Sequence, residues 1–174
     1  AVIVGIEDRD NYIVRRSVNL SHQKHIIASN IDIAFLLVTV AGPVTTPAFI
    51  DRFLVTAEAY RIKTVLLFNK IDTYDQEQID EMLFLSAMYR EIGYTCIELS
   101  ATTGKNIDKV KELMLDKTSL FSGHSGVGKS TLVNALQPGL DLKTSDISSI
   151  HQQGQHTTTF AEMFDLDFGA RIID

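Results

Sequence analysis

Apolar runs separated by helix-patterned stretches organise the chain from residue 31 onward. Runs without polar alternation are typical of strands that are buried on both faces of a sheet. Their alternation with helices predicts an α/β fold with a mostly parallel sheet that is covered on both sides. The predicted strands of this sheet are 31–40, 64–68, 94–99, 118–121 and 170–173.

Four amphipathic stretches predict the helices that cover this sheet. The first begins with Thr46 as the cap and Pro47 at the first helical position, where a missing N–H breaks no helical hydrogen bond. Its apolar residues Ile50, Leu54 and Ala57 recur at helical spacing, so this face should lie on the sheet. The other three helices are expected at about 75–91, 106–115 and 130–136.

The first 16 residues follow a different pattern. Two strands, Ala1–Ile6 and Tyr12–Arg16, are predicted on either side of the polar turn 7–11. A two-stranded hairpin is not stable alone, so it either packs on the main domain or belongs to a small β domain. A later segment, 137–157, is rich in Gly, Ser, Gln and His, and irregular segments of such length are usually functional or mobile.

The composition narrows the class of protein. The 174 residues are 45% hydrophobic, which is enough for one ordinary core, and the net charge of −6 argues against broad affinity for nucleic acid. Cys96 lies in a strand pattern and is expected to be a buried apolar residue rather than a nucleophile. No apolar run reaches the roughly 20 residues of a membrane span and no signal peptide is recognisable, so no membrane contact and a cytoplasmic location are expected.

Residues 123–130, Gly-His-Ser-Gly-Val-Gly-Lys-Ser, match the phosphate-binding pattern G-x-x-x-x-G-K-[ST] completely, between a predicted strand and a predicted helix. The glycines permit a tight turn in which amide N–H groups point at phosphate oxygens, and the helix N-terminus adds partial positive charge. Lys129 is expected to reach the β- and γ-phosphates, Ser130 to ligate Mg²⁺ and Thr131 to lie near the α-phosphate. The predicted nucleotide-binding residues of this loop are Gly123, His124, Ser125, Gly126, Val127, Gly128, Lys129, Ser130 and Thr131.

A second motif, Asn69-Lys70-Ile71-Asp72, indicates guanine rather than adenine. A carboxylate at Asp72 can accept hydrogen bonds from both N1–H and the 2-amino group of guanine, a pair of donors that adenine lacks. Asn69 is expected to brace the phosphate loop or contact the base, and the Lys70 stem to cover one face of the ring. Ser100-Ala101 follows another predicted strand, where a backbone N–H would read guanine O6.

These motifs occur in an unusual order, because most GTPases have the phosphate loop before the guanine motif. Circular permutation preserves such a site, since the termini of a compact domain can be rejoined without moving its core. Two further elements then follow the phosphate loop. Within 156–159, His-Thr-Thr-Thr, Thr158 is our first choice as Mg²⁺ ligand and γ-phosphate sensor, and Asp174 is expected to bind Mg²⁺ directly or through water.

We expect a group other than the usual glutamine to position the attacking water. Many GTPases use a glutamine just after an Asp-x-x-Gly motif, and this chain ends before that position. His156 precedes the switch threonines, so ordering of that loop would bring its imidazole to the nucleophile. His156, Lys129 and Thr158 are therefore the predicted catalytic residues.

In this order, the motifs at 69–72, 100–101, 123–131 and 154–159 make the chain similar to the ribosome small-subunit-dependent GTPase A family, also called RsgA or YjeQ. The resemblance covers essentially the whole chain and implies a circularly permuted P-loop GTPase that uses GTP or GDP with Mg²⁺. It implies a role in late maturation of the small (30S) ribosomal subunit, with that subunit and its 16S rRNA as partners. Hydrolysis would be stimulated by the subunit, and the protein would be a monomer.

Proteins similar to this one have an N-terminal OB-fold domain, a small β-barrel, and a C-terminal zinc-binding domain. The resemblance implies that residues 1–25 are the C-terminal remnant of the OB-fold domain with its linker. Residues 26–174 would then be the permuted GTPase domain, truncated after Asp174. One structural Zn²⁺ is expected in the full-length protein, but its Cys and His ligands are absent from this chain.

Other functions share some of these motifs. A permuted GTPase of large-subunit assembly typically carries Pro-Gly-Thr-Thr where this chain has Gln-His-Thr-Thr at 155–158. A nucleotide-gated binding module with negligible hydrolysis would need the same residues, and an assay of phosphate release separates it from an enzyme. An ATPase or small-molecule kinase would not need Asp72. A metal site at His151 and His156 is disfavoured, because no cysteine lies near them.

Overall fold

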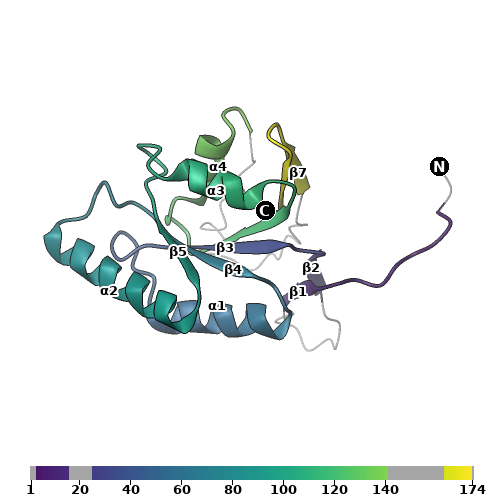
Figure 1. The fold of residues 1–174 in the computed structure, drawn as a ribbon, viewed down its shortest axis with the longest axis horizontal. Helices are drawn as coiled ribbons and strands as arrows, with labels where there is room; N and C mark the ends of the chain where they lie inside the picture. The colour runs from purple at the N-terminus through teal and green to yellow at the C-terminus, as the bar shows by residue number, and fades with distance from the viewer. Residues whose placement is uncertain (1–2, 16–24, 141–162, 174) are drawn as a thin grey trace, which may run out of the picture.

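A computed structural model describes residues 3–15, 25–140 and 163–173. Its centre is a six-stranded sheet in the order β5-β4-β3-β6-β8-β7 (Figure 1). Neighbouring strands are parallel except β7 and β8, which pair antiparallel. This mostly parallel sheet confirms the predicted fold class. The strands are β3 (Ile33–Val38), β4 (Thr64–Phe68), β5 (Thr95–Glu98), β6 (Thr118–Ser122), β7 (Met163–Leu166) and β8 (Ala170–Ile173).

Helices cover both faces of this sheet, with α1 and α2 on one side and α3 and α4 on the other (Figure 1). The predicted and observed helices agree to within two residues at each end. Their bounds are α1 (Pro47–Ala59), α2 (Gln76–Ile92), α3 (Ile107–Met114) and α4 (Lys129–Leu136).

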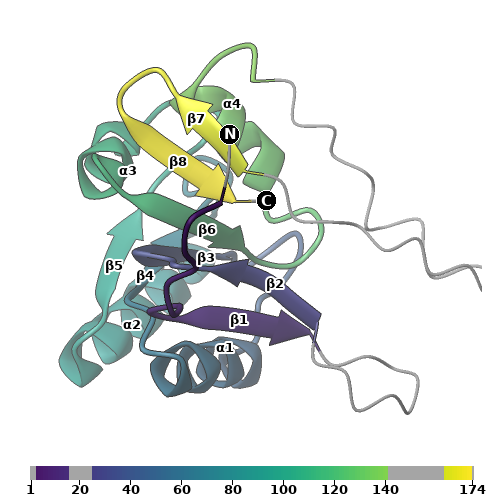
Figure 2. The ribbon, with the colours of Figure 1, turned by 90° about the vertical axis from the view of Figure 1, so that its right-hand side faces the viewer.

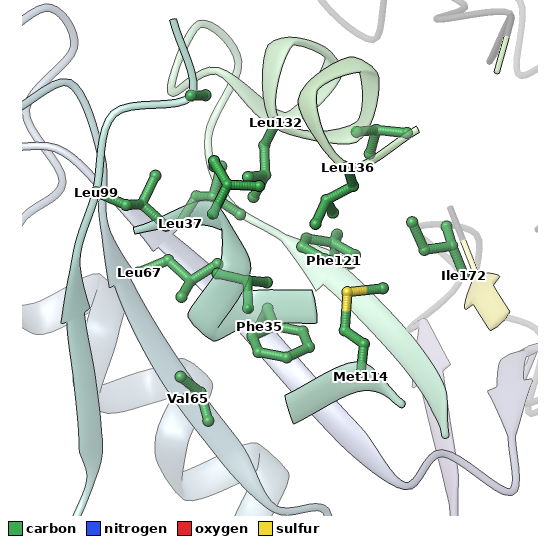
Figure 3. Close-up of a cluster of buried hydrophobic side chains, with 14 of the residues drawn as sticks. Phe35, Leu37, Val65, Leu67, Leu99, Met114, Phe121, Leu132, Leu136 and Ile172 are labelled. Atoms are coloured by element: carbon green, nitrogen blue, oxygen red, sulfur yellow. The ribbon is translucent and has the colours of Figure 1, made fainter. Parts of the chain in front are cut away.

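The central strand β3 separates two hydrophobic cores. Phe35 and Leu37 pack in the core beneath α3 and α4, which Figure 3 shows together with Met114. The intervening residues Leu36 and Val38 pack in the core beneath α1 and α2. Because both faces are buried, every residue of β3 is apolar, and the strand shows no polar alternation.

Capping hydrogen bonds fix the ends of α2, whereas the start of α1 has no side-chain cap. At the start of α2, Asp75 accepts a hydrogen bond from the Gln78 backbone N–H at 3.0 Å, and the Gln78 side chain accepts from Asp75 N–H at 3.3 Å. Gly93 closes this helix in the left-handed conformation. Thr46 occupies the cap position of α1, but its side chain makes no capping hydrogen bond. The fixed φ of Pro47 therefore defines the start of α1.

The predicted pairing of the first strands is wrong. β1 (Tyr12–Arg15) pairs antiparallel with β2 (His25–Ser29), a strand that the sequence analysis did not expect, and residues 3–9 form no strand. The polar residue Asn11, predicted to lie in a hairpin turn, instead hydrogen-bonds through both side-chain atoms to the backbone of Ile31 at 2.8 Å. A strand needs a partner for its backbone groups, and alternation of residue types alone does not supply one.

The β1–β2 hairpin packs on the larger sheet domain (Figure 2). Ile13 and Ala28 join a small core with Ala57 of α1. The rings of Tyr12 and Tyr60 lie 5.1 Å apart. These contacts supply the apolar burial that a two-stranded sheet lacks by itself.

Cys96 is buried among apolar residues at the edge strand β5, as predicted. Burial raises the pKa of its thiol to about 11, so the thiol remains protonated and poorly nucleophilic near neutral pH. Among the described residues, no helix is both long and apolar enough to cross a bilayer.

A polar network fastens α2 to β5. The Glu98 carboxylate accepts hydrogen bonds from Arg90 Nη2 at 2.7 and 2.9 Å and from the Ser86 hydroxyl. Burial alone would raise the pKa of Glu98, but the hydrogen bonds and the Arg90 charge outweigh it and hold the pKa below its ordinary value. A carboxyl with a lowered folded-state pKa contributes stability above its unfolded pKa, and that stability is lost as the pH falls through the folded pKa.

We therefore expect Glu98→Gln to lower the free energy of unfolding by roughly 1–2 kcal/mol near pH 7, the range for charge-assisted hydrogen bonds. The difference from the parent should shrink as the pH falls below the ordinary glutamate pKa of about 4.3 and through the lowered pKa of Glu98, because the parent carboxyl then also becomes neutral. Urea unfolding at both pH values measures this. Glu91→Gln, on the exposed side of α2, is the matched control and should change stability little at either pH. A pH-independent loss in Glu98→Gln would contradict the ionic origin.

Candidate nucleotide-binding site

The carboxyl ends of four parallel strands meet at one edge of the sheet. β4 leads into Asn69–Asp72, β5 into Leu99–Ala101, β6 into the phosphate loop, and β3 into residues 39–46. Ligands of open α/β sheets bind outside the carboxyl ends of the strands. All predicted motifs that the structure describes therefore lie at one edge, although they are far apart in the sequence.

The phosphate loop connects β6 to α4, as predicted. Gly126 and Gly128 have φ of +80° and +97°, a region that favours glycine. No side chain caps α4, so the first amide N–H groups of this helix are left for a ligand. The hydroxyl-bearing residues Ser130 and Thr131 are exposed at its start. This combination suits an anionic phosphate chain.

Two glycines of the loop are also required by close packing. A Cβ on Gly123 would lie 2.9 Å from the Leu37 carbonyl oxygen, and a Cβ on Gly128 would lie 2.5 Å from Asn69 Nδ2. Val127, between them, is fully buried in the core under α4. The loop is therefore held against β3 and β4 by contacts that admit no side chain at either glycine.

Lys129 lies at the first position of α4, and its ammonium group turns back over the loop. Nζ donates hydrogen bonds to the carbonyl oxygens of Gly123 at 2.6 Å and His124 at 3.0 Å. The charge is thus held at the loop, where the motif predicts phosphate. The His124 ring packs against Phe49 of α1 with centroids 3.9 Å apart and planes tilted by 35°, and Ser125 is exposed.

Asn69 joins three parts of the site. Its side-chain Nδ2 donates to the Val127 carbonyl at 2.8 Å, and its Oδ1 accepts from the Ala101 N–H at 3.0 Å. The side chain is 2% exposed, so both bonds are shielded from water. Of the two roles predicted for Asn69, the geometry shows the bracing of the phosphate loop.

Lys70 and Asp72 follow on a turn at the surface. Lys70 has a left-handed backbone with φ of +69°, and its ammonium donates to the Gly42 carbonyl. Asp72 is exposed, and its carboxylate makes no hydrogen bond or ion pair with any described residue. An exposed carboxylate without protein partners is suited to receive a ligand.

The Ser100–Ala101 segment is more constrained than predicted. Ser100 is fully buried, and its Oγ accepts from the Thr103 N–H at 3.0 Å. A backbone N–H of Ser100-Ala101 was predicted to read guanine O6, and the Ala101 N–H already donates to Asn69. Recognition of O6 by this N–H therefore competes with the contact that braces Asn69.

The β3–α1 segment, residues 39–46, and Phe49 in the first turn of α1 are parts of the site that sequence reasoning missed. The Gly42 carbonyl accepts a hydrogen bond from the Lys70 ammonium, and Pro43 lies against the position of Gly126. Phe49, at the start of α1, packs its ring against that of His124. A Gly-Pro pair directly after a buried strand at this sheet edge was the available signal. Tyr74, which contacts the same segment, was missed as well.

Three predicted residues, His156, Thr158 and Asp174, lie outside the described residues. Their roles stay predictions. Within the described part of the chain, no group of three or more His, Cys, Asp or Glu side chains is arranged to hold a metal ion.

Solved structures share this fold. YjeQ from Thermotoga maritima is 34% identical with a TM-score of 0.76, covering 98% of this chain and 52% of that one. YloQ, described as a circularly permuted GTPase, is 28% identical with a TM-score of 0.67, covering 98% and 49%. The fold is thus that of the circularly permuted GTPases. A family model described as RsgA GTPase matches residues 6–174, and the chain belongs to this family.

Curated relatives are closer in sequence. The small ribosomal subunit biogenesis GTPase RsgA of Christiangramia forsetii is 65% identical over 173 residues, which are 99% of this chain and 55% of the relative. The protein of the same name from Bacteroides fragilis is 53% identical over 174 residues, covering 100% and 56%. The chain spans about half the length of the curated relatives that it matches.

Proposed function

We propose that this chain is the guanine-nucleotide-binding and GTP-hydrolysing part of a factor in late maturation of the small ribosomal subunit. The observation that carries the proposal is the position of Asn69, which ties the guanine motif to the phosphate loop at 2.8 Å and to Ser100–Ala101 at 3.0 Å. One buried side chain thereby sets the separation between the base end and the phosphate end of the site. The names of the relatives support the biological role.

The base end selects guanine. The Asp72 carboxylate, which has no hydrogen bond or ion pair with any described residue, accepts the two guanine donors, and the Lys70 stem covers the ring. Adenine lacks the 2-amino group, so its complex would leave the carboxylate unsatisfied. Purine selectivity therefore arises from a difference in hydrogen bonding rather than in shape.

The phosphate end holds the nucleotide by its charge. Positive charge and hydrogen-bond donors gather at this end, from the loop amides, the N-terminus of α4 without a side-chain cap, and the Lys129 ammonium. The exposed Ser130 hydroxyl fits a Mg²⁺ ligand, with Thr158 and Asp174 as the further ligands that we propose. When bound, Mg²⁺ neutralises charge on the β- and γ-phosphates.

We propose that His156 positions the attacking water for hydrolysis. In the intact protein with small subunits present, His156→Ala should lower kcat by roughly 100-fold or more and leave GTP affinity nearly unchanged. Multiple-turnover phosphate release with and without subunits measures this. An unchanged subunit-stimulated kcat would remove His156 from the mechanism. No turnover in the parent under either condition would favour a nucleotide-gated binding module.

The resemblance to the family supports our proposals for the partners and for the neighbouring domains. We propose a cytoplasmic monomer that contacts the small subunit and its 16S rRNA. Residues 1–25 would end an OB-fold domain, and 26–174 would form the permuted GTPase domain. A structural Zn²⁺ would be held by a further domain, outside this chain.

Titration of the purified protein with labelled GTP, GDP and ATP tests the core of the proposal. Tight binding of both guanine nucleotides with weak binding of ATP is the expected result. Equal affinity for GTP and ATP would contradict the role of Asp72. Stimulation of hydrolysis by large rather than small subunits would assign the protein to assembly of the large ribosomal subunit.

A further inference from the structure

The Tyr74 hydroxyl lies between two loops of the nucleotide site. It donates a hydrogen bond to the Asn69 carbonyl at 2.6 Å and accepts one from the Val40 N–H at 3.1 Å. The ring is half-buried against the core under α1 and α2. A single hydroxyl thus connects the guanine motif to the β3–α1 segment.

The bond to Asn69 closes the turn that carries the guanine motif. Tyr74 and Asn69 flank Lys70 and Asp72, so the hydroxyl ties the two ends of this short turn together. With that bond, the backbone N–H, the backbone carbonyl and both side-chain polar atoms of Asn69 all have partners. The direction of the Asp72 carboxylate is then set by a turn that is fixed at both ends.

The hydrogen bond from the Val40 N–H supports Lys70, the second residue of the motif that is proposed to contact the base. Val40 opens the segment whose Gly42 carbonyl accepts the Lys70 ammonium. Without the phenol oxygen, the Val40 N–H would lose its acceptor, and the support of Lys70 would loosen. Both side chains proposed to contact the base therefore depend on one hydroxyl.

The protonation state suits this double role. Burial raises the pKa of Tyr74, and the negative charge of Asp72 adds to this effect, while hydrogen bonds from the backbone of Val40 and Ala41 oppose it. The phenol is therefore neutral near pH 7 and retains the proton that it donates to Asn69.

We infer that Tyr74 is a positioning residue for guanine recognition, acting through the turn that carries Asp72 and through the loop that holds Lys70. This inference rests on the proposed function, since it concerns how the same site selects its base. It predicts a defect in selectivity rather than a general loss of binding.

Tyr74→Phe removes the hydroxyl and keeps the ring. Affinities for GDP and for inosine diphosphate, which lacks the 2-amino group, isolate the second hydrogen bond to Asp72. We expect the preference of the parent for GDP over inosine diphosphate to fall by roughly tenfold in Tyr74→Phe, about the contribution of one well-aligned hydrogen bond. Isothermal titration at one temperature provides both affinities.

Tyr89→Phe is the matched control. Tyr89 is a buried tyrosine of the same core, and its hydroxyl donates to Asp51 at 2.8 Å, away from the site. The Tyr89→Phe variant should retain the parent's preference for GDP over inosine diphosphate within about twofold, even if the variant is less stable. An unchanged ratio in Tyr74→Phe, or an equal fall in Tyr89→Phe, would overturn the inference. A parent that fails to prefer GDP over ADP would instead overturn the proposed function, and the inference with it.

A second measurement needs no substitution. If the turn and the base are coupled through the hydroxyl, base binding must also stabilise the hydroxyl contacts, because coupling is reciprocal. Saturating GDP should therefore slow hydrogen exchange of the Val40 amide in the parent more than inosine diphosphate does. Equal exchange rates with the two nucleotides would contradict the inference even if Tyr74→Phe did not fold.

Discussion

Asp72→Ala should weaken GDP binding by roughly 30- to 800-fold, which corresponds to a loss of 2–4 kcal/mol for a bidentate contact whose partners are left unpaired. The affinity for ADP should change little, so the preference for guanine should largely disappear. The exposed position of Asp72, without a described protein partner, means that its removal breaks no contact in the free protein. The melting temperature of the nucleotide-free protein should therefore stay close to that of the parent.

Asp72→Asn tests the same contact through a gain of affinity for a different nucleotide, xanthosine diphosphate. An amide offers one acceptor and one donor, which match the N1–H and the 2-carbonyl of xanthine, whereas a carboxylate offers acceptors only. This variant should prefer xanthosine diphosphate to GDP. Glu112→Ala, an exposed carboxylate on α3, is the control for charge and should retain the parent selectivity. GDP affinity equal to that of the parent in Asp72→Ala would show that another residue reads the base.

The central strands and the phosphate loop are predictable because their signals are local. β3 and β4 read as buried strands from their own residues, and the loop glycines are required where the backbone has positive φ. The role of Asn69 was predictable in part, since a residue at the end of one parallel strand lies beside the loop of a neighbouring strand. Local patterns therefore located the site.

The contacts of the β3–α1 segment are not predictable in this way. Gly42 with Lys70 and Phe49 with His124 join residues far apart in the sequence, and the sequence pattern does not indicate which residues form each pair. The prediction for the first strands was wrong for a related reason. Residues 3–6 have strand-like composition, yet the partner of β1 is β2, which follows a stretch that carries no strand signal. Pairing is decided by tertiary contacts rather than by composition.

The permuted order leaves the chemistry of the site intact because the sheet holds it. β3 lies between β4 and β6 and is parallel to both, so the guanine motif and the phosphate loop emerge at the same edge whichever comes first in the chain. Asn69 then spans the distance between them. The order of elements in the sequence therefore matters less for binding than the contacts across this edge.

Gly128→Ala tests those contacts most severely. The residue has φ of +97°, and an added Cβ would lie 2.5 Å from Asn69 Nδ2, which is closer than any tolerated contact. Asn69 would have to leave the Val127 carbonyl, and both loops that it joins would lose their brace. We expect GDP affinity to fall at least about 100-fold, together with a loss of roughly 2–4 kcal/mol in the free energy of unfolding from strain and broken buried hydrogen bonds.

Gly139→Ala is the control that separates the steric clash with Asn69 from the strain of a positive φ. Its φ of +83° is similar, but a Cβ there would meet nothing within 4 Å. This control should show only the strain of a left-handed alanine, about 1–2 kcal/mol, and nucleotide affinity within about twofold of the parent. Calorimetric titration with GDP and urea unfolding of both variants measure the two effects. If Gly128→Ala bound GDP as tightly as Gly139→Ala, the brace that Asn69 forms would not be what holds the base and phosphate ends of the site in register.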